Sequence, residues 1–193
     1  GAGGGLIDNL GYPYCRGRVF DSVEEDHGQY DDETEIFWAS GCCLFIRRKD
    51  YWDQNGFDAR FFAHQEEIDL CWRLINSGRT IFYTGKSKVY HVGGGTLNKQ
   101  NPRKTFLNFR NNLSMMLKNL PTNKLWLIFI RLCLDGVAGI YMLFKDGPKH
   151  TWAIVKSHFA FYGQFGGTLK LRQSNQKKNY YQTKNLIFKH FLK

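Results

Sequence analysis

The order of apolar and polar residues predicts strands in the first half of the chain, separated by turns. The run from Ile36 to Ile46 is apolar on both faces, as a central strand of a sheet is. Within this run, Ser40-Gly41 indicates a bulge or a close approach by another group. Shorter apolar pieces over residues 80–83 and 88–91 predict two further strands.

Helical periodicity takes over from residue 65 onward. The first predicted helix covers residues 65–77 and is followed by Gly78, a residue type that commonly caps helix C-termini. We expect the segment before residue 35, which is rich in Gly, Asp and Glu, and the basic tail from Lys170 to be mostly irregular. The later predicted helices are those of residues 104–119, 125–144 and 148–165.

The acidic start of the first predicted helix carries the candidate chemistry. Glu67 stands above Leu70 and Leu74, so we expect it to lean toward the interior or a cleft. A carboxylate aimed inward suits a general base, because partial desolvation raises its pKa, although the helix dipole favours the anion. The alternative is an acidic first turn that only caps the helix. The stripe expected to face solvent holds Glu66, Asp69, Arg73 and Asn76.

The apolar segment Leu125–Phe144 is 20 residues long, enough to span a bilayer. Arg131 and Asp135 lie near its middle at i, i+4 spacing and can pair, but charges at that depth of a membrane are costly. We therefore favour a helix that lies in the membrane interface or packs on parts of the protein missing from this sequence.

The 193 residues suffice for one domain with a core, or for one domain plus an appendage. Charge is distributed unevenly along them. The net charge is −6 over residues 1–60, +7 over 61–144 and +9 over 145–193. This asymmetry indicates an anionic partner for the C-terminal part: phospholipid headgroups, a nucleotide-linked substrate or nucleic acid. A basic nucleic-acid-binding or non-catalytic interaction module is the alternative function. We expect no nucleic-acid partner, because no recognisable binding motif is present and the first 60 residues are acidic.

Five cysteines are scattered without a CxxC pair or the spacing of a zinc site. They predict buried free thiols in a reducing compartment, and hence a cytoplasmic protein. The chain opens with Gly-Ala-Gly-Gly-Gly, which has neither an initiator Met nor the pattern of a secretory signal. We expect it to be a piece of a longer protein.

Several motifs occur in a fixed order: the apolar strand, Gly56-Phe57-Asp58 with Phe61-Phe62, the acidic helix start, His91-Val92-Gly93-Gly94, and then Arg110-Asn111-Asn112. As an ordered set over residues 1–120, they resemble the C-terminal half of bacterial family 2 glycosyltransferases, particularly rhamnosyltransferase-like and galactofuranosyltransferase-like members. The resemblance implies an α/β fold class: a partial GT-A domain, its acceptor-side half, over residues 1–120. Residues 121–193 then form a helical, basic extension that can associate with a membrane.

The resemblance also implies roles for individual residues. Glu67 matches the catalytic base, where the family usually has Asp, and Glu66 matches the acid before it. His91 matches a metal-holding His, although a histidine at the end of a strand often has only a structural role. Residues expected at the sugar and acceptor site are Trp38, Ser40 and Gly41, with His64 and Asp69 as further substrate contacts; His64 alternatively has a surface or capping role. A metallohydrolase built on these His and Glu residues lacks the usual HExxH spacing.

The implied reaction is an inverting transfer of a sugar from a nucleotide-sugar donor to a hydroxyl of a saccharide acceptor, lipid-linked in cell-surface polysaccharide synthesis. The family uses a divalent cation, Mg²⁺ or Mn²⁺, held mainly by an Asp-x-Asp in its first half, and this sequence contains no such half. We therefore predict that the 193-residue chain alone does not transfer sugar. We expect the whole enzyme to be peripheral to the inner face of the cell membrane, with an anionic membrane surface as a further partner.

Overall fold

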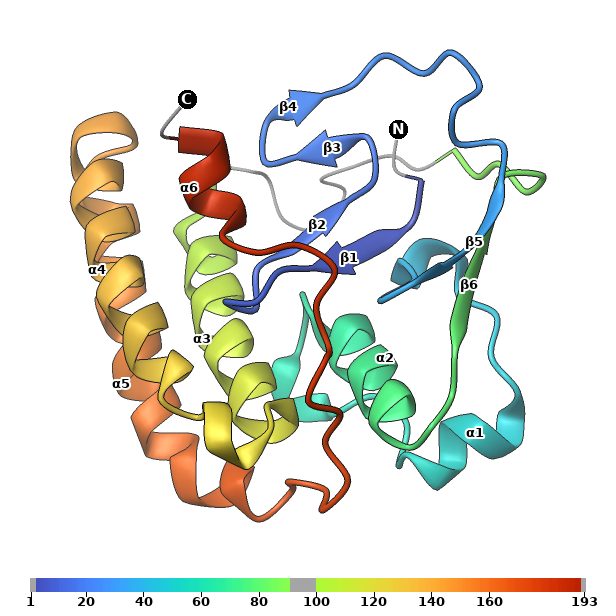
Figure 1. The fold of residues 1–193 in the computed structure, drawn as a ribbon. Helices are drawn as coiled ribbons and strands as arrows, with labels where there is room; N and C mark the ends of the chain where they lie inside the picture. The colour runs from blue at the N-terminus through green and yellow to red at the C-terminus, as the bar shows by residue number, and fades with distance from the viewer. Residues whose placement is uncertain (1–2, 91–99, 192–193) are drawn as a thin grey trace. The chain divides into compact units, whose positions relative to one another are not determined.

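The structure is a computed structural model that describes residues 3–90 and 100–191 and has a mixed α/β composition with helices toward the C-terminus (Figure 1). Contacts divide the chain into two compact units. The first unit comprises residues 1–58, 67–91 and 177–193, and the second comprises residues 59–66 and 92–176. The domain boundary expected at residue 120 stays a prediction.

The first unit contains two small antiparallel sheets (Figure 1). One has the strand order β1 (Gly5–Ile7), β2 (Pro13–Cys15), β3 (Arg18–Val19) and β4 (Ser22–Val23). Most described residues before residue 35 lie outside strands, as expected, but these four short strands were not predicted. These strands are two or three residues long, too short for an alternation of apolar and polar residues to be recognised. Gly11 and Gly17 lie in the turns between them, each with φ of 76°.

The second sheet pairs β5 (Glu33–Ile36) with β6 (Ile81–Thr84), which confirms the strand expected near residues 80–83. The expectation that one strand continues to Ile46 is wrong. The β5–β6 pairing stops at Ile36, residues Gly41–Cys43 form the short helix η1, and Phe45 is 92% exposed. Beyond Ile36, Trp38 makes an isolated antiparallel bridge with Gly5 of β1, and Ser40 and Leu44 on either side of η1 keep extended backbone angles. Residues 88–90 form no strand, and position 91 of that prediction lies outside the described residues.

Helix α2 (Glu66–Asn76) confirms the predicted acidic helix, and Gly78 follows it with φ of 88°. Its expected solvent-facing stripe is wrong, because Asp69 is fully buried and Arg73 and Asn76 are nearly so. Arg73 pairs with Asp69 at 2.9 Å and donates to the carbonyl oxygens of Gln54 and Gly56, which follow helix α1 (Arg48–Asp53). The chain after α1 thus covers the face that the helical pattern assigns to water.

The C-terminal tail of the first unit is also more ordered than expected. Tyr180 is 2% exposed, its ring centroid lies 5.0 Å from that of Trp72, and its hydroxyl donates to the carbonyl oxygen of Asn9 at 2.6 Å. Helix α6 (Leu186–Phe191) ends the described chain, and the backbone N–H of Leu186 donates to Asp8 at 3.1 Å. These contacts join the last residues to the first hairpin, a pairing that local sequence does not reveal.

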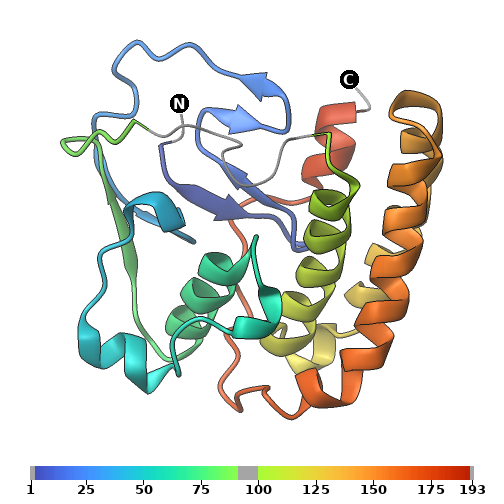
Figure 2. The same cartoon turned by 180° about the vertical axis from the view of Figure 1, so that it is seen from behind.

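The second unit is built on three helices: α3 (Pro102–Asn119), α4 (Leu127–Lys145) and α5 (Pro148–Leu169). They confirm the three later predicted helices to within a few residues. Helix α5 packs against α3 and α4, and Figure 2 shows the orange α5 next to the green α3. Thr105 of α3 and His150 of α5 are joined by a buried 2.8 Å hydrogen bond. Two short helices, η2 (Ala59–Phe61) and η3 (Thr122–Lys124), complete the unit.

The five cysteines are all free. Cys15 and Cys71 are buried as expected, but Cys42 and Cys133 are exposed, so the expectation of uniformly buried thiols is wrong. Burial raises the pKa of the Cys71 thiol to about 12, which keeps it protonated and unreactive.

Candidate active site

Glu67, the predicted base, lies in the first turn of α2 beside the predicted site residues Ser40 and Gly41. A Cβ atom placed on Gly41 would be 4.0 Å from the Cβ of Glu67. One turn further, the Cys71 thiol is hydrogen-bonded to the backbone of Ala39. Residues 39–41 therefore run along the start of α2. The Glu67 side chain is half-buried, with one carboxylate oxygen out of reach of solvent.

Trp38 is held by the fold two residues before Ser40. Its indole N–H donates to the carbonyl oxygen of Leu6 at 2.9 Å, and a Cβ atom on Gly5 would lie 2.1 Å from its ring. Gly5 is thus required for the ring to lie against β1. The N–H of Trp38 is already used, so only the exposed part of the ring is left for contact with a sugar. Ser40 is exposed, with its hydroxyl 3.2 Å from the Cys42 sulfur.

Asp69 has a different environment from the other predicted site residues. Its side chain is fully buried, and its carboxylate accepts a hydrogen bond from Arg73. The pair ties α2 to the chain that follows α1 through the Arg73 contacts with Gln54 and Gly56. Asp69 therefore stabilises the helix that carries Glu67, and its substrate-binding role stays a prediction.

In the second unit, the loop that leads into α2 has an unusual backbone. Phe62, His64 and Gln65 have φ of 64°, 70° and 71°, in the left-handed region that favours glycine. Each such residue costs about 1–3 kcal/mol and persists only where surrounding contacts hold it. Three of them within four residues mark a backbone that is fixed by its neighbours.

Three consecutive residues of α3, which we call the loop clamp, supply those contacts: Arg110, Asn111 and Asn112. The amide nitrogen of Asn111 lies 3.0, 2.9 and 2.8 Å from the carbonyl oxygens of Phe61, Ala63 and His64. Arg110 donates to the carbonyl oxygens of Arg60 and Phe61 and to the Asn111 side chain. The clamp thus fixes the backbone immediately before the acidic pair.

Asn112 fixes the side chain of the loop's last residue before α2. Its amide donates to Gln65 Oε1 at 3.1 Å, and Gln65 Nε2 in turn lies 3.4 Å from the carbonyl oxygen of Asn108. Asn111 and Asn112 are only 1% and 2% exposed. Sequence reasoning used these residues for the resemblance without giving them a role. The available signal was three adjacent strong hydrogen-bonding groups in a helix otherwise rich in apolar residues.

His64 and Glu66 present polar atoms that the fold leaves unused. His64 Nε2 and Glu66 Oε2 are buried, and neither has a hydrogen-bond partner among the described residues. Burial, followed by the nearby charge of Lys104, lowers the pKa of His64, while Glu66 acts in the opposite direction. The imidazole is therefore neutral at pH 7. Buried polar atoms without protein partners are free to bind water or a ligand, and such atoms also occur elsewhere in the described part of the fold, as at Trp72 and Thr168.

The predicted metal ligand, His91, lies outside the described residues. In the ranges 3–90 and 100–191, no three His, Cys, Asp or Glu side chains gather closely enough to hold a metal ion. The described residues therefore do not form a cation site, and the Mg²⁺ or Mn²⁺ cofactor stays a prediction.

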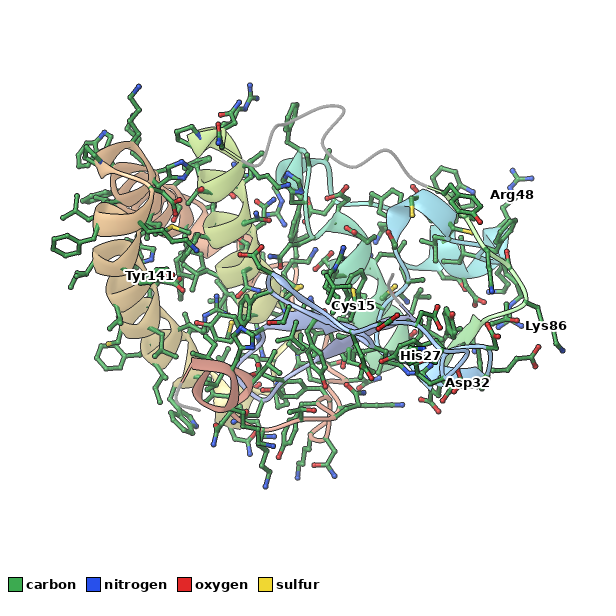
Figure 3. All side chains as sticks on the ribbon, turned by 90° about the horizontal axis from the view of Figure 1, so that it is seen from above. Cys15, His27, Asp32, Arg48, Lys86 and Tyr141 are labelled. Atoms are coloured by element: carbon green, nitrogen blue, oxygen red, sulfur yellow. The ribbon has the colours of Figure 1, made fainter. Side chains whose placement is uncertain are left out.

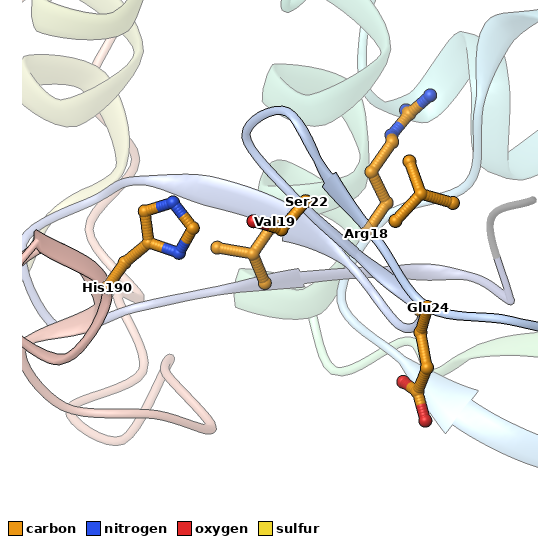
Figure 4. Close-up of a pocket in the computed structure, with 7 residues that line it drawn as sticks. Arg18, Val19, Ser22, Glu24 and His190 are labelled. Carbon is orange, nitrogen blue, oxygen red and sulfur yellow. The ribbon is translucent and has the colours of Figure 1, made fainter. Parts of the chain in front are cut away.

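A cavity of about 470 Å³ in the first unit is separate from the predicted site residues (Figure 4). Its walls are the β3–β4 hairpin and His190 of α6, with Arg18 and Glu24 among the lining side chains. It contains no member of the acidic pair and none of the residues expected to bind sugar.

Comparison with known proteins gives a partial match. Over 59 residues, 31% of its length, the chain is 37% identical to N-acetylglucosaminyl-diphospho-decaprenol L-rhamnosyltransferase of Mycobacterium tuberculosis, in the strains CDC 1551 and H37Rv. Over 59 residues it is also 34% identical to rhamnosyltransferase WbbL of Escherichia coli K12. The chain is similar to bacterial rhamnosyltransferases. These are family 2 glycosyltransferases, so the resemblance inferred from the motifs is confirmed.

The match has a limited extent. It covers 19% of the length of the M. tuberculosis proteins and 22% of the E. coli protein. No family model and no solved structure matches the chain. The similarity to rhamnosyltransferases therefore supports a glycosyltransferase relationship, while the GT-A fold stays a prediction.

Proposed function

We propose that this chain is the acceptor side of an inverting glycosyltransferase, which moves a sugar from a nucleotide-sugar donor to a hydroxyl of a saccharide acceptor. The observation that carries the proposal is the position of Glu67, half-buried at the start of α2 beside Gly41, in a chain similar to rhamnosyltransferases. One relative is named for N-acetylglucosaminyl-diphospho-decaprenol, which favours a lipid-linked acceptor of cell-surface polysaccharide synthesis.

Glu67 is proposed as the general base. As the acceptor oxygen attacks the anomeric carbon, its proton passes to a carboxylate oxygen of Glu67, and the bond to the nucleoside diphosphate breaks. Gly41 has no side chain, so it leaves space for an acceptor hydroxyl beside the carboxylate. The N–H groups at the start of α2 favour the ionised carboxylate, whereas partial burial opposes it.

Glu66 and His64 are proposed to orient the substrate. Their buried atoms without protein partners are suited to hydrogen bonds with sugar hydroxyls, and a neutral imidazole can donate or accept. The loop clamp fixes the backbone of both residues before substrate arrives, which lowers the entropic cost of orientation.

The chemistry of the leaving diphosphate calls for positive charge, which a divalent cation supplies in enzymes of this class. The described residues do not form a cation site, so we propose that residues outside them would hold the cation. We propose that the 193-residue chain alone is inactive, because the resemblance implies a nucleotide-binding half with an Asp-x-Asp, and this sequence contains no Asp-x-Asp. Sustained turnover of a nucleotide sugar by the isolated chain would disprove this.

The decisive experiment uses the enzyme that carries this segment, with Glu67→Gln, Glu66→Gln and, as a matched control, Glu35→Gln on the exposed part of β5. We expect Glu67→Gln to lower kcat by about 10²–10⁴-fold with unchanged donor affinity, because only proton transfer is lost. Glu66→Gln should mainly raise KM for the acceptor, and the control should be fully active. If Glu67→Gln keeps a normal kcat and Glu66→Gln loses it, the general base is Glu66 and the assignment of Glu67 is wrong.

A further inference from the structure

Helix α4 has the reverse of the usual distribution of charged and apolar residues. Its two charged residues between Trp126 and Phe144 are Arg131 and Asp135, which are 3% and 1% exposed and form an ion pair at 3.3 Å. Nε2 of His158 on α5 lies 3.5 Å from the same Asp135 carboxylate. A helix that faces water places its charges outward and its apolar residues inward. The outward side of α4 is therefore not suited to water.

The side of α4 that faces away from α3 and α5 is apolar over its whole length. We call it the outer face, and it consists of Trp126, Phe129, Val137, Ile140, Tyr141 and Phe144, which are 53–85% exposed. Tyr141, marked in Figure 3, lies on this side of the helix. Helix α5, which packs beside α4, also carries exposed rings: Trp152, Phe159 and Tyr162 are each more than half exposed. An exposed apolar surface of this extent marks an interaction site.

The residue types and charges around the outer face indicate what covers it. Trp and Tyr are enriched where proteins meet the headgroup region of a bilayer, and two of each lie on these helices. Lys124 precedes α4, Lys145 ends it, and Lys149 opens α5. Lys156 lies among the exposed rings of α5, with its ammonium 5.7 Å from the centre of the Trp152 ring. These cations complement the negative charge of phospholipid headgroups.

The orientation follows from the packing of α4 on α5. The segment Thr122–Lys145 is long and apolar enough to cross a membrane, and 28% of its most apolar window is buried within the protein. The Thr151 hydroxyl donates to the carbonyl oxygen of Gly139 at 2.8 Å, and Nε2 of His158 on α5 lies 3.5 Å from Asp135 on the inner side of α4. A helix attached to its unit along one whole side is suited to lie in the plane of the interface.

We propose that the outer face docks on an anionic phospholipid bilayer, with α4 lying flat in the interface and the flanking lysines against phosphate groups. This inference rests on the three helices of the second unit and does not depend on the transferase activity. A second copy of the chain is the competing occupant of the same face, and the experiment below distinguishes the two.

The experiment measures sedimentation of the 193-residue chain with vesicles of phosphatidylcholine alone and of phosphatidylcholine with phosphatidylglycerol, at low and high salt. We expect binding to the anionic vesicles, weakened at high salt and accompanied by a blue shift of tryptophan fluorescence. Phe144→Glu should lower the vesicle affinity by at least about tenfold, because it places a charge where lipid is expected. The matched control is Phe45→Glu, since Phe45 is 92% and Phe144 85% exposed and Phe45 lies in the other unit.

Circular dichroism of both variants verifies that they are folded, and the exposure of the two side chains favours this outcome. If the chain binds neither kind of vesicle, the proposal is overturned. Equal vesicle affinities of Phe144→Glu and Phe45→Glu would also overturn it. A dimer in lipid-free solution that Phe144→Glu dissociates, without vesicle binding, would assign the face to a second copy. If α4 spans the bilayer, the chain that flanks it on one side lies inside the vesicle. Protection of that flank from protease added outside a sealed vesicle would show a spanning helix and overturn the flat orientation.

Discussion

Asn111 offers the most direct test of how the acidic pair is positioned. Its amide nitrogen lies within 3.0 Å of three loop carbonyl oxygens, and the residue is 1% exposed. Two N–H groups make two full hydrogen bonds, each with a net value of about 0.5–1.5 kcal/mol. Asn111→Ala removes both bonds and leaves the partly buried carbonyl groups of Ala63 and His64 without this donor, at about 1–3 kcal/mol, while Phe61 keeps its bond from Arg110. We therefore expect the free energy of unfolding to fall by about 3 kcal/mol.

Strain in the loop backbone offsets part of this loss in the free energy of unfolding. Phe62, His64 and Gln65 each store about 1–3 kcal/mol in their positive φ angles, and a loop without its clamp recovers part of this energy as it relaxes. Relaxation moves His64 and Glu66 away from their fixed positions. In the active enzyme, Asn111→Ala should therefore lower kcat/KM even at temperatures where the protein remains folded.

The assay is urea denaturation of the 193-residue chain followed by far-ultraviolet circular dichroism. Asn123→Ala is the matched control, because Asn123 is an exposed asparagine of the same unit and its change should stay within about 0.5 kcal/mol. A loss below about 1 kcal/mol in Asn111→Ala would refute the view that this amide holds the loop.

Three further predictions concern other parts of the fold. Gly5→Ala places a Cβ atom too close to the Trp38 ring and should lower the free energy of unfolding by about 2–3 kcal/mol. The tryptophan emission should change as well. Unchanged stability and emission would contradict the close packing of Gly5 and Trp38. Asp135→Asn leaves Arg131 without its buried counter-charge and should lower the free energy of unfolding by about 3–5 kcal/mol. The double variant Arg131→Met with Asp135→Leu should be nearly as stable as the original chain. Equal losses of stability in the two variants would be inconsistent with a buried ion pair. The lowered pKa of His64 means that the folded state resists protonation, so stability is complete above about pH 6.5 and falls as the pH drops through the folded pKa. Urea midpoints at several pH values should show a smaller pH dependence for His64→Asn, and an identical dependence would exclude His64 as a source.

The candidate site was accessible from sequence to different degrees. The acidic start of α2 and the approach of Gly41 were expected from local patterns, and the structure places Gly41 beside Glu67. The loop clamp was not expected, because Asn111 and its three acceptors are separated by about 50 residues along the chain. No periodicity relates positions so far apart, and the left-handed residues of the loop carry no glycine to reveal them.

The sequence by itself determined where the long helices α2, α3, α4 and α5 lie, because helical hydrogen bonds and side-chain periodicity are local. It also contained the motif order that resembles glycosyltransferases. Only the tertiary structure decided which faces are covered: Asp69 and Arg73 became buried where the pattern predicted water, and α4 turned its apolar side outward. Burial depends on which distant segments pack against a helix, and that information is not contained in the spacing of residues along it.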